Sequence, residues 1–509
     1  MFFDKLINML GGGVADAAGD LSYEPAGIAS DHRKAVPGGL FVCIEGFVAD
    51  GHAYAADALA NGAVAIISQK PLSGLNLPAE QVAKVKAFVQ VRDSRRALAA
   101  ASHLYYGEPS KALALAGVTG TKGKTTTTYM IRSILGAAGV KTGLIGSICN
   151  YIGDEERAAG ETTPESITLA GLFAEMAGKG CSHAVMEVSS QGLALRRVDF
   201  CDYDVGVYTN FYKDHISPLE HRDVAEYFEA KNKLFSLCKK AVINADIAEF
   251  EAVRAAAVRA GREGAILTYS ADYEGANHGA ADIRARDIEL ISDRKVYSRF
   301  YAETPWFSGS FTVNLPGRYN VSNALAAIAV CGLFGAPKEA VAAGLSGVNV
   351  RGRTELVSEG QNFTVLVDFA HNAASLEALL KMLHEYKFET ITTVFGCGGN
   401  RARDRRFDMG EASGRLSGFT VITSDNPRKE EPAMIIADIV TGLSRTDGRY
   451  IIIEDRREAI KYAIDSAPEG SLVLIAGKGH ETTQTFSDRT IPFDDVLVAR
   501  EFLRERLAK

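Results

Sequence analysis

The segment 117–135 has residue types and spacing that suit phosphate binding. Its sequence is GVTGTKGKTTTTYMIRSIL, in which a buried-strand pattern ending at Val118 leads into a glycine-rich turn and then a helix with an apolar stripe. The backbone N–H groups of such a turn, together with the N-terminus of the helix, bind phosphate oxygens. Lys124 can reach the outer phosphates, and the Thr125 hydroxyl can ligate Mg²⁺. A strict GxxxxGKT motif would have glycine in place of Val118, so the match is to a GTxGKTT variant. We predict that this turn binds a nucleotide.

Two further strand ends carry side chains that bind metals. The predicted strand HAVMEVSS ends near Glu187, and the predicted strand DVGVYTN is followed by Lys213, Asp214 and His215. A carboxylate is a preferred ligand of Mg²⁺, and a metal beside a phosphate site can assist phosphoryl chemistry. Taken alone, His215 is more typical of a surface or core histidine. Together with the phosphate-binding turn, these residues indicate two metal positions.

Four polar clusters in the last third of the chain each follow directly on a predicted strand. They occupy residues 371–372, 398–401, 425–428 and 477–481. In an open parallel sheet, ligands bind outside the carboxyl ends of the strands. We therefore predict that the four clusters lie along one edge of a sheet and form one binding site.

Length and composition set the frame for these sites. The chain has 509 residues, enough for about three domains. Hydrophobic residues make up 47% and charged residues 23%, as in ordinary globular proteins. Lys plus Arg number 56 and Asp plus Glu number 63, so the formal charge is 56 − 63 = −7. That balance argues against a chain built to coat nucleic acid or an anionic membrane.

The cysteines and the N-terminal segment indicate a cytoplasmic protein. The seven cysteines are scattered and never form a CxxC pair, which favours neither a disulfide framework nor a zinc site. The first residues, MFFDKLINMLGGG, carry Asp4 and Lys5 inside their apolar run, which is not the pattern of a signal peptide. No later segment has the unbroken apolar length of a membrane span.

The periodicity predicts an α/β protein of three domains. Short apolar runs at 39–44, 63–68 and 87–91 alternate with Ala-rich stretches and indicate a small N-terminal α/β domain, 1–108. Gly107 and Pro109 break the chain before the central P-loop domain, 109–346, whose strand-like runs at 112–118, 183–188, 205–209 and 241–244 favour a mostly parallel sheet. Residues 245–312 are more polar and are expected to hold an antiparallel excursion. An Ala-rich helix follows Asn320, and a C-terminal Rossmann-like domain, 347–509, repeats the βα alternation.

Ten motifs in this order resemble those of the Mur ligases. They are GTKGKTT, ETTPES, MEVSSQGL, TNFYKDH, EYFEAKNKLF, GRYNVSNALAA, RGRTE, DFAHN, SDNPR and GKGHET. The resemblance extends from about residue 27 to beyond residue 481. Within the family it is strongest to the branch that adds the third peptide residue of peptidoglycan precursors, and SDNPR is similar to the form that accepts meso-diaminopimelate.

The resemblance implies an ATP-dependent amide ligase. ATP would phosphorylate the D-glutamate side of UDP-MurNAc-L-Ala-D-Glu, and an incoming amine would displace phosphate. By this resemblance Thr125 and Glu187 serve one Mg²⁺, while His215 and a carbamylated Lys231 serve another. A carbamate would convert a cationic amine into the oxygen ligand that a hard cation prefers. Without the family motif, Lys231 would be an ordinary solvated helix lysine.

The resemblance also assigns four groups of site residues. The catalytic group is Lys124, Glu187, His215 and Lys231. The ATP-binding group is Gly120, Thr121, Lys122, Gly123, Lys124, Thr125, Thr126, Asn320, Asn323 and Arg353. The group for the UDP-MurNAc-dipeptide is Ser30, His32, Phe47, Val48 and Ala49 at the uridine end, with Thr162, Thr163, Ser189 and Arg197 at the peptide end. The amino-acid group is Arg401, Asp425, Asn426, Pro427, Arg428, Gly477 and Glu481.

The residues of the amino-acid group suit a zwitterion. Arg401 and Arg428 can hold a carboxylate while Glu481 meets an ammonium. The expected partners are therefore the UDP-sugar dipeptide and meso-diaminopimelate, with a monomeric protein, no nucleic acid and no membrane insertion. Several positions depart from the usual family pattern and bear on substrate positioning, namely His32, Lys122, Gln191, Ala402 and the segments HISPLEH and FAHNAA.

Three alternatives remain at this point. The same scaffold could add L-lysine or another amine. A nucleotide-binding module could sense UDP-sugars without joining them, although Glu187, Lys231 and His215 argue against it. A ligase similar to folylpolyglutamate synthetase shares the central fold, but the long N-terminal domain and the DNPR motif disfavour it.

Overall fold

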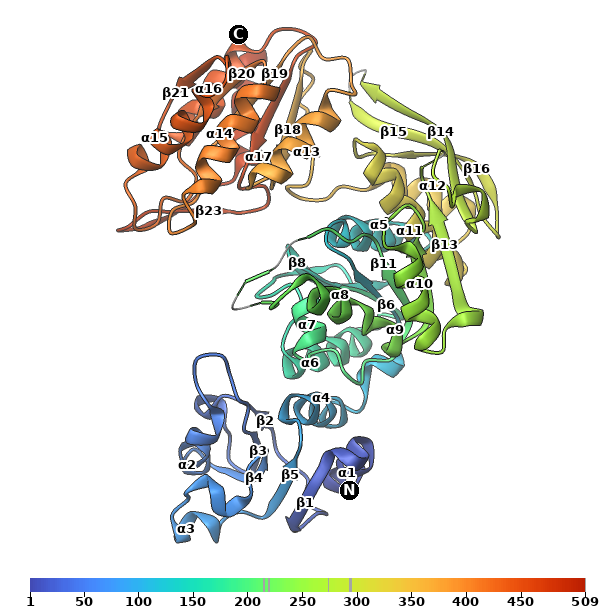
Figure 1. Ribbon diagram of the computed structural model, residues 1–509, viewed down its shortest axis with the longest axis vertical. Helices are drawn as coiled ribbons and strands as arrows, with labels where there is room; N and C mark the ends of the chain where they lie inside the picture. The colour runs from blue at the N-terminus through green and yellow to red at the C-terminus, as the bar shows by residue number, and fades with distance from the viewer. Residues whose placement is uncertain (214–215, 218–219, 273, 293–294, 509) are drawn as a thin grey trace. The chain divides into compact units, whose positions relative to one another are not determined.

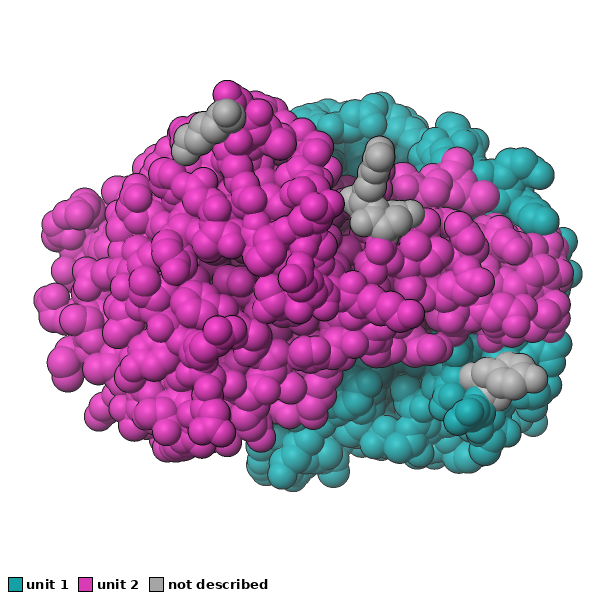
Figure 2. Space-filling model, turned by 90° about the horizontal axis from the view of Figure 1, so that it is seen from above, with its two compact units in different colours: residues 1–284, 304–306, 325–341 teal, residues 285–303, 307–324, 342–509 magenta. Residues whose placement is uncertain are grey.

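A computed structural model describes residues 1–213, 216–217, 220–272, 274–292 and 295–508 of the chain. It divides into two compact units, shown in different colours in Figure 2. The first comprises Met1–Arg284, Thr304–Trp306 and Leu325–Val341, and the second comprises Ala285–Glu303, Phe307–Ala324 and Ala342–Lys509. Among the described residues, no helix is both long enough and apolar enough to cross a membrane.

The N-terminal part of the first unit is a five-stranded sheet with helices (Figure 1). Its strand order is β1-β5-β4-β3-β2, and only the β1–β5 pair is antiparallel. The strands are β1 (Val14–Gly19), β2 (Ile28–Ala29), β3 (Gly39–Val42), β4 (Ala63–Ser68) and β5 (Ala87–Val91). The helices are α1 (Phe2–Leu10), α2 (Ala55–Ala60), α3 (Ala79–Val82) and α4 (Ser94–Tyr105). The three predicted strands are confirmed as β3, β4 and β5.

The larger sheet of the first unit is mostly parallel, as predicted. Along the strand order β13-β12-β11-β6-β10-β7-β8-β9, the β7–β8 and β8–β9 pairs are antiparallel and the other pairs are parallel. The strands are β6 (Ala114–Thr119), β7 (Thr142–Ile145), β8 (Cys149–Ile152), β9 (Glu155–Ala158), β10 (His183–Glu187), β11 (Tyr203–Tyr208), β12 (Cys238–Asn244) and β13 (Ile266–Ser270). The helices are α5 (Lys124–Ala137), α6 (Ser166–Gly178), α7 (Ser190–Ala194), α8 (Val224–Asn232), α9 (Leu234–Leu237) and α10 (Phe250–Arg259).

An antiparallel segment follows this sheet, as the polar stretch predicted. The strand β14 (Ile283–Ser292) begins by pairing with β13 through Ile283 and Arg284. The strands β15 (Val296–Glu303) and β16 (Ser308–Val313) then pair antiparallel. The predicted Ala-rich helix is α11 (Arg318–Leu333), and α12 (Lys338–Gly347) comes next.

The C-terminal part of the second unit is a six-stranded sheet with helices on both faces. Its order is β17-β18-β22-β19-β20-β21, and only the β17–β18 pair is antiparallel. The strands are β17 (Glu355–Leu356), β18 (Thr364–Asp368), β19 (Ile391–Phe395), β20 (Phe419–Ile422), β21 (Tyr450–Ile452) and β22 (Leu472–Ala476), and a separate hairpin joins β23 (Thr483–Thr485) to β24 (Thr490–Pro492). The helices are α13 (Ala373–Leu383), α14 (Asp404–Leu416), α15 (Pro432–Leu443), α16 (Arg456–Ser466) and α17 (Asp495–Leu507).

Burial on both faces explains the continuous apolar runs of this last sheet. In β22, Leu472 and Leu474 pack into the core shared with α13, α14 and α15, whereas Val473 and Ile475 pack into the core shared with α16 and α17. Because successive side chains of a strand point to opposite faces, a strand covered on both sides has no polar face. This arrangement leaves the strand ends as the places where polar side chains can reach a ligand.

Candidate active site

The predicted phosphate-binding turn joins β6 to α5 and depends on glycine at two positions. Gly120 and Gly123 have φ values of 142° and 84°, which L side chains rarely adopt. A Cβ on Gly120 would lie 2.0 Å from Thr209 Oγ1. Asn210 holds the turn, because Lys122 N donates to its Oδ1 at 2.8 Å and its Nδ2 donates to Lys122 O at 3.0 Å. The turn therefore has a fixed shape at the start of α5.

Lys124 lies at the first position of α5 and folds back over the turn. Its Nζ donates to Gly120 O at 2.8 Å and to Thr121 O at 3.1 Å. The first backbone N–H groups of an α-helix have no partner within the helix, so this end attracts anions. The ammonium and the helix start thus present positive charge on the same side of the turn.

Thr125 and Glu187 form a buried pair of oxygen donors beside the turn. Thr125 Oγ1 donates to Glu187 Oε2 at 3.0 Å, and Glu187, at the end of β10, is 1% exposed. Ser147 completes the cluster: its N–H donates to Glu187 Oε1 at 2.8 Å and its hydroxyl donates to Oε2 at 3.1 Å. A hydroxyl and a carboxylate are the donor types that Mg²⁺ takes, so Thr125 and Glu187 fit the predicted metal position. The contribution of Ser147, which follows β7 after Gly146, was missed from the sequence.

Lys231 lies against the same turn from α8. Its side chain is 1% exposed, its Nζ donates to Gly120 O at 2.9 Å, and it lies 4.5 Å from the centroid of the Tyr227 ring. Tyr227 in turn donates its hydroxyl to Thr121 Oγ1 at 3.0 Å. The simple alternative of a solvated helix lysine is therefore wrong. His215, the other predicted ligand of the second metal, lies outside the described residues. Within the described ranges, no group of three or more His, Cys, Asp and Glu side chains could hold a metal.

The four residues predicted for the peptide end lie next to Glu187. Thr163 Oγ1 donates to Glu187 O and accepts from Ser189 N, both at 2.9 Å, and Thr162 Oγ1 is 3.0 Å from Ser147 Oγ. Arg197 is mostly buried and donates to Thr163 O at 2.9 Å. It also pairs with Glu161 at 2.9 Å and Glu165 at 2.6 Å, whose side chains are about half exposed. A substrate carboxylate would compete with these two glutamates for the guanidinium.

Arg196, the neighbour of Arg197, contacts the N-terminal part of the first unit. The turn that ends α7 is closed by Arg196 N donating to Leu193 O and Arg197 N donating to Gly192 O, which places Arg196 in a left-handed conformation with φ 59°. Glycine is the usual residue at such a position. The Arg196 guanidinium pairs with Asp93 at 2.5 Å and with Asp199 at 3.1 Å. One turn thus directs two adjacent arginines to two different partners.

The residues predicted for the uridine end follow the parallel strands β2 and β3. The His32 ring stacks on Tyr54 with centroids 4.7 Å apart and an angle of 6°, and Ser30 is half-buried beside it in the chain. Phe47 and Val48 are 60% and 98% exposed at the tip of a tight turn in which Gly46 N donates to Ala49 O at 3.0 Å. The sequence did not indicate Tyr54.

The remaining residues predicted for ATP belong to the second unit. Asn320 and Asn323 are buried in α11, where Asn320 Nδ2 donates to Pro316 O at 2.7 Å and Asn323 Nδ2 donates to Asn320 Oδ1 at 3.0 Å. The Arg353 guanidinium lies 5.0 Å from the centroid of the Phe369 ring. Burial raises the pKa of the nearby Asp368 carboxyl, and the charge of Arg353 opposes that rise.

The four polar clusters of the last third follow β18, β19, β20 and β22, which are adjacent parallel strands, so the prediction of a shared edge is confirmed. Arg428 donates from Nη1 to Gly399 O at 2.8 Å and has a left-handed backbone, with φ 54°. Asn426 Nδ2 donates to Glu481 Oε2 at 2.7 Å. Arg401 is exposed.

Asp425, between these residues, is buried together with Pro427. Burial raises the pKa of its carboxyl, while the charges of Arg456 and Lys478 oppose that rise. Gly477, with φ 111°, is needed beside it, because a Cβ there would lie 2.7 Å from Asp425 Oδ2.

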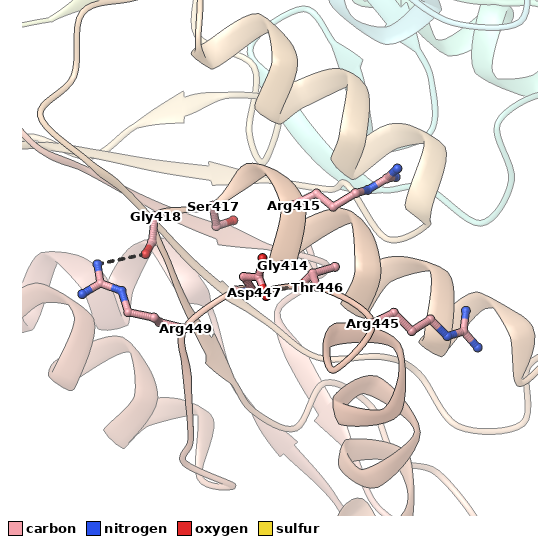
Figure 3. A pocket seen from close by; sticks show the side chains of 9 residues that line it. Gly414, Arg415, Ser417, Gly418, Arg445, Thr446, Asp447 and Arg449 are labelled. Carbon is pink, nitrogen blue, oxygen red and sulfur yellow. Dashed lines mark hydrogen bonds between the residues drawn. The ribbon is translucent and has the colours of Figure 1, made fainter.

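A hollow of about 410 Å³ elsewhere in this part of the chain holds none of the predicted site residues. Gly418 and Arg449, which line it, directly precede β20 and β21, so it lies at the amino ends of the strands. Arg449 points to the opposite side of the hollow from Arg415 and Arg445 (Figure 3), and the guanidinium groups of these two both pair with Glu411. Because ligands of open parallel sheets bind at the carboxyl ends of strands, the four clusters are the better candidate site.

A glycine-rich turn with a buried Thr–Glu pair, followed by a sheet with polar clusters at its carboxyl edge, is typical of a nucleotide-binding P-loop protein, and comparisons with known proteins show its family. Residues 26–106 match the Mur ligase family, catalytic domain; residues 118–331 match the Mur ligase middle domain; and residues 352–479 match the Mur ligase, glutamate ligase domain. The chain belongs to the Mur ligase family.

Two curated relatives carry the name UDP-N-acetylmuramoyl-L-alanyl-D-glutamate–2,6-diaminopimelate ligase. The one from Caldanaerobacter subterraneus subsp. tengcongensis is 39% identical, and the match covers 98% of this chain and 99% of that protein. The one from Alkaliphilus metalliredigens is 43% identical, with 93% and 92% covered. A solved structure of a ligase of the same name aligns with a TM-score of 0.73 and 28% identity, covering 100% of this chain and 99% of the other.

Folylpolyglutamate synthase from Mycobacterium tuberculosis shares the fold, with a TM-score of 0.58, 20% identity, and 81% and 94% of the two chains covered.

Proposed function

We propose that this protein is an ATP-dependent ligase that joins meso-diaminopimelate to UDP-N-acetylmuramoyl-L-alanyl-D-glutamate in peptidoglycan precursor synthesis. The observation that carries the proposal is the buried contact of Thr125 with Glu187 beside the Gly120–Lys124 turn, which unites a phosphate site and a cation site. The names of the relatives, which match over nearly the whole chain, support the substrates.

The first chemical step is the transfer of a phosphoryl group. A D-glutamate carboxylate oxygen attacks the γ-phosphorus of ATP, the bond to the β-phosphate oxygen breaks, and ADP and an acyl phosphate result. Positioning and positive charge supply most of the catalysis of such a transfer. The start of α5 and Lys124 offer that charge, and Arg197 with Thr162, Thr163 and Ser189 holds the peptide end close to Glu187.

The second step forms the amide. The amine nitrogen attacks the acyl carbon, phosphate leaves with its electron pair, and the amine loses a proton. An acyl phosphate is needed because a free carboxylate is a poor acyl donor. Arg401 and Arg428 bind the distal carboxylate of the amine substrate and Glu481 binds its ammonium, with Asp425, Asn426, Pro427 and Gly477 shaping the site.

Thr125 and Glu187 would hold one Mg²⁺, and His215 with a carbamylated Lys231 would hold a second; bound Mg²⁺ would neutralise charge on the phosphates. The burial of Lys231 and its contact with Gly120 O support a role at the phosphates rather than in solvent. Asn320 and Asn323 bind the adenine side of ATP and Arg353 its phosphates.

The uridine end lies at Ser30, His32 and the turn of Phe47, Val48 and Ala49. The exposed apolar tip of that turn and the stacked His32–Tyr54 pair offer flat surfaces suited to a base. The three matched regions support a division into 1–108 for the UDP-sugar, 109–346 for ATP and 347–509 for the amine. The protein acts as a cytoplasmic monomer.

The proposal is tested by phosphate release from ATP with purified protein and Mg²⁺. We expect release only when both the UDP-sugar dipeptide and meso-diaminopimelate are present, together with one new amide by mass spectrometry. Phosphate release that occurs in the absence of either substrate, or binding of ATP without any product, would contradict the proposal.

A further inference from the structure

A buried lysine, Lys478, lies beside the proposed amine site. Lys478 follows Gly477 at the end of β22, and its side chain is 0% exposed. Its Nζ donates to Glu481 Oε2 at 3.0 Å, to Thr483 O at 2.6 Å and to Asn426 Oδ1 at 3.3 Å. An ammonium withdrawn from water needs such compensation.

These contacts decide how Glu481 faces a ligand. Its Oε2 accepts from both Lys478 Nζ and Asn426 Nδ2, whereas its Oε1 takes part in neither bond. The Asn426 amide is held in turn, because its Oδ1 also accepts from Thr485 N at 3.0 Å. The Glu481 side chain remains 34% exposed. One oxygen is therefore fixed inside the protein while the carboxylate still reaches the binding edge.

The charges along this edge are predominantly positive. Lys478 balances Glu481 within hydrogen-bond distance. The part-buried Arg405 can offset the charge of the buried Asp425, so the charges of Arg401 and Arg428 remain in excess. The buried pair of Arg456 with Asp495 is neutral as a unit, with both side chains 0% exposed. A bare ammonium would enter a field of net positive sign, whereas a zwitterionic end brings a carboxylate for the arginines and an ammonium for Glu481.

We propose that Lys478 is a specificity-determining residue of the amine site, which offsets the charge of Glu481 so that an accepted amine must carry a distal carboxylate as well as an ammonium. The inference rests on the proposed function, since it concerns the amine that this ligase selects. Lys478 acts through Glu481 and Asn426 and touches no substrate atom.

Two analogues of meso-diaminopimelate test the inference on the unaltered protein. L-Lysine lacks the distal carboxylate but keeps the ammonium, and 2-aminopimelate lacks the distal ammonium but keeps the carboxylate. We expect 2-aminopimelate to inhibit amide formation with meso-diaminopimelate more strongly than L-lysine does. Stronger inhibition by L-lysine would overturn the inference, because the site would then favour the bare cation.

The variant Lys478→Met tests the residue itself, because methionine keeps an unbranched side chain, one atom shorter than that of lysine, and removes the charge. The ratio of kcat/KM for meso-diaminopimelate to that for L-lysine should fall by about tenfold or more, the scale expected when a contact charge is removed. Lys478→Arg, which keeps the charge, should retain the original ratio even where packing lowers both rates. A purely structural role would lower both rates and leave the ratio unchanged, and that result would refute the inference.

The matched control is Lys429→Met. Lys429 is exposed, lies next to Arg428 in the chain and carries the same charge, and its backbone N–H donates to Asn400 Oδ1 at 3.2 Å. An equal change in the ratio for this variant would show that overall charge, and not the Lys478–Glu481 pair, sets the preference. If the unaltered protein forms no amide with any amine, the proposed function fails; if it joins meso-diaminopimelate and Lys478→Met keeps the ratio, only the present inference fails.

Discussion

The ion pair of Arg456 with Asp495 is the most deeply buried charge pair near the proposed amine site. Both side chains are 0% exposed, and the guanidinium donates to Asp495 through Nε at 2.8 Å and Nη2 at 2.7 Å. Arg456 Nη2 also donates to Ala476 O at 3.0 Å, directly before Gly477. We predict that Arg456→Met destabilises the protein strongly, because Asp495 is left as an unpaired buried charge.

The expected size follows from this geometry. Removing one partner of a fully buried pair costs about 3–5 kcal/mol. For a unit of this size, about 1 kcal/mol shifts Tm by about 2–4 °C, so Arg456→Met should lower the transition by about 6–20 °C. The double variant Arg456→Met/Asp495→Leu removes both charges and should recover most of that loss.

Thermal unfolding of the single and double variants measures the effect, with amide formation as the second assay. The double variant should fold stably but show a raised KM for meso-diaminopimelate, because Ala476 O loses the donor that holds the end of β22. If the double variant is as unstable as Arg456→Met, or if the single variant shifts Tm by less than about 2 °C, the account of this pair is wrong.

Three further predictions follow from the first unit. Lys231→Ala should lose at least about 100-fold in kcat, the scale of a damaged metal site, with partial recovery in added short-chain carboxylates; full activity would eliminate the carbamate proposal. Arg196→Gly should keep its Tm, because glycine suits the left-handed backbone. The variant should raise KM for the UDP-sugar dipeptide by up to about fivefold, because the half-exposed pair with Asp93 is worth about 1 kcal/mol at most. A drop in Tm with unchanged KM would contradict this prediction. Burial lowers the pKa of His103 from 6.5 to about 4, so the unfolded chain binds a proton at a higher pH than the folded protein does. The stability that His103 contributes above pH 6.5 should therefore be lost as the pH falls toward 4. His103→Asn should flatten that loss in thermal scans, whereas the same change at exposed His384 should leave the slope as it is.

The strands that carry the sites could be predicted because they are buried. The β6 run before Gly120 and the β22 run before Gly477 are continuous and apolar, and each ends in a polar cluster. Within each sheet, parallel pairing then requires that the carboxyl ends of neighbouring strands lie at one edge. The hairpin of β8 with β9 was missed, because the side chains of β9 (Glu155–Ala158) are mostly exposed and carry no apolar pattern.

The contacts that complete the sites could not be predicted, because they join distant parts of the chain. Ser147 meets Glu187 across 40 positions, Asn210 meets Lys122 across 88, and Lys478 meets Asn426 across 52. Only the packing of the strands determines these distances. The motifs therefore indicated the candidate loops, whereas the structure identified which side chains hold these loops in place.

The formation of an acyl phosphate by this protein is the central claim, and transfer of an oxygen isotope tests it most directly. UDP-MurNAc-L-Ala-D-Glu labelled with ¹⁸O in both D-glutamate carboxylates would be incubated with the protein, ATP, Mg²⁺ and meso-diaminopimelate. We expect one ¹⁸O atom in each released phosphate and one new amide for each phosphate. Amide formation with unlabelled phosphate would contradict the mechanism, and labelled or unlabelled phosphate without any amide would contradict the ligase activity itself.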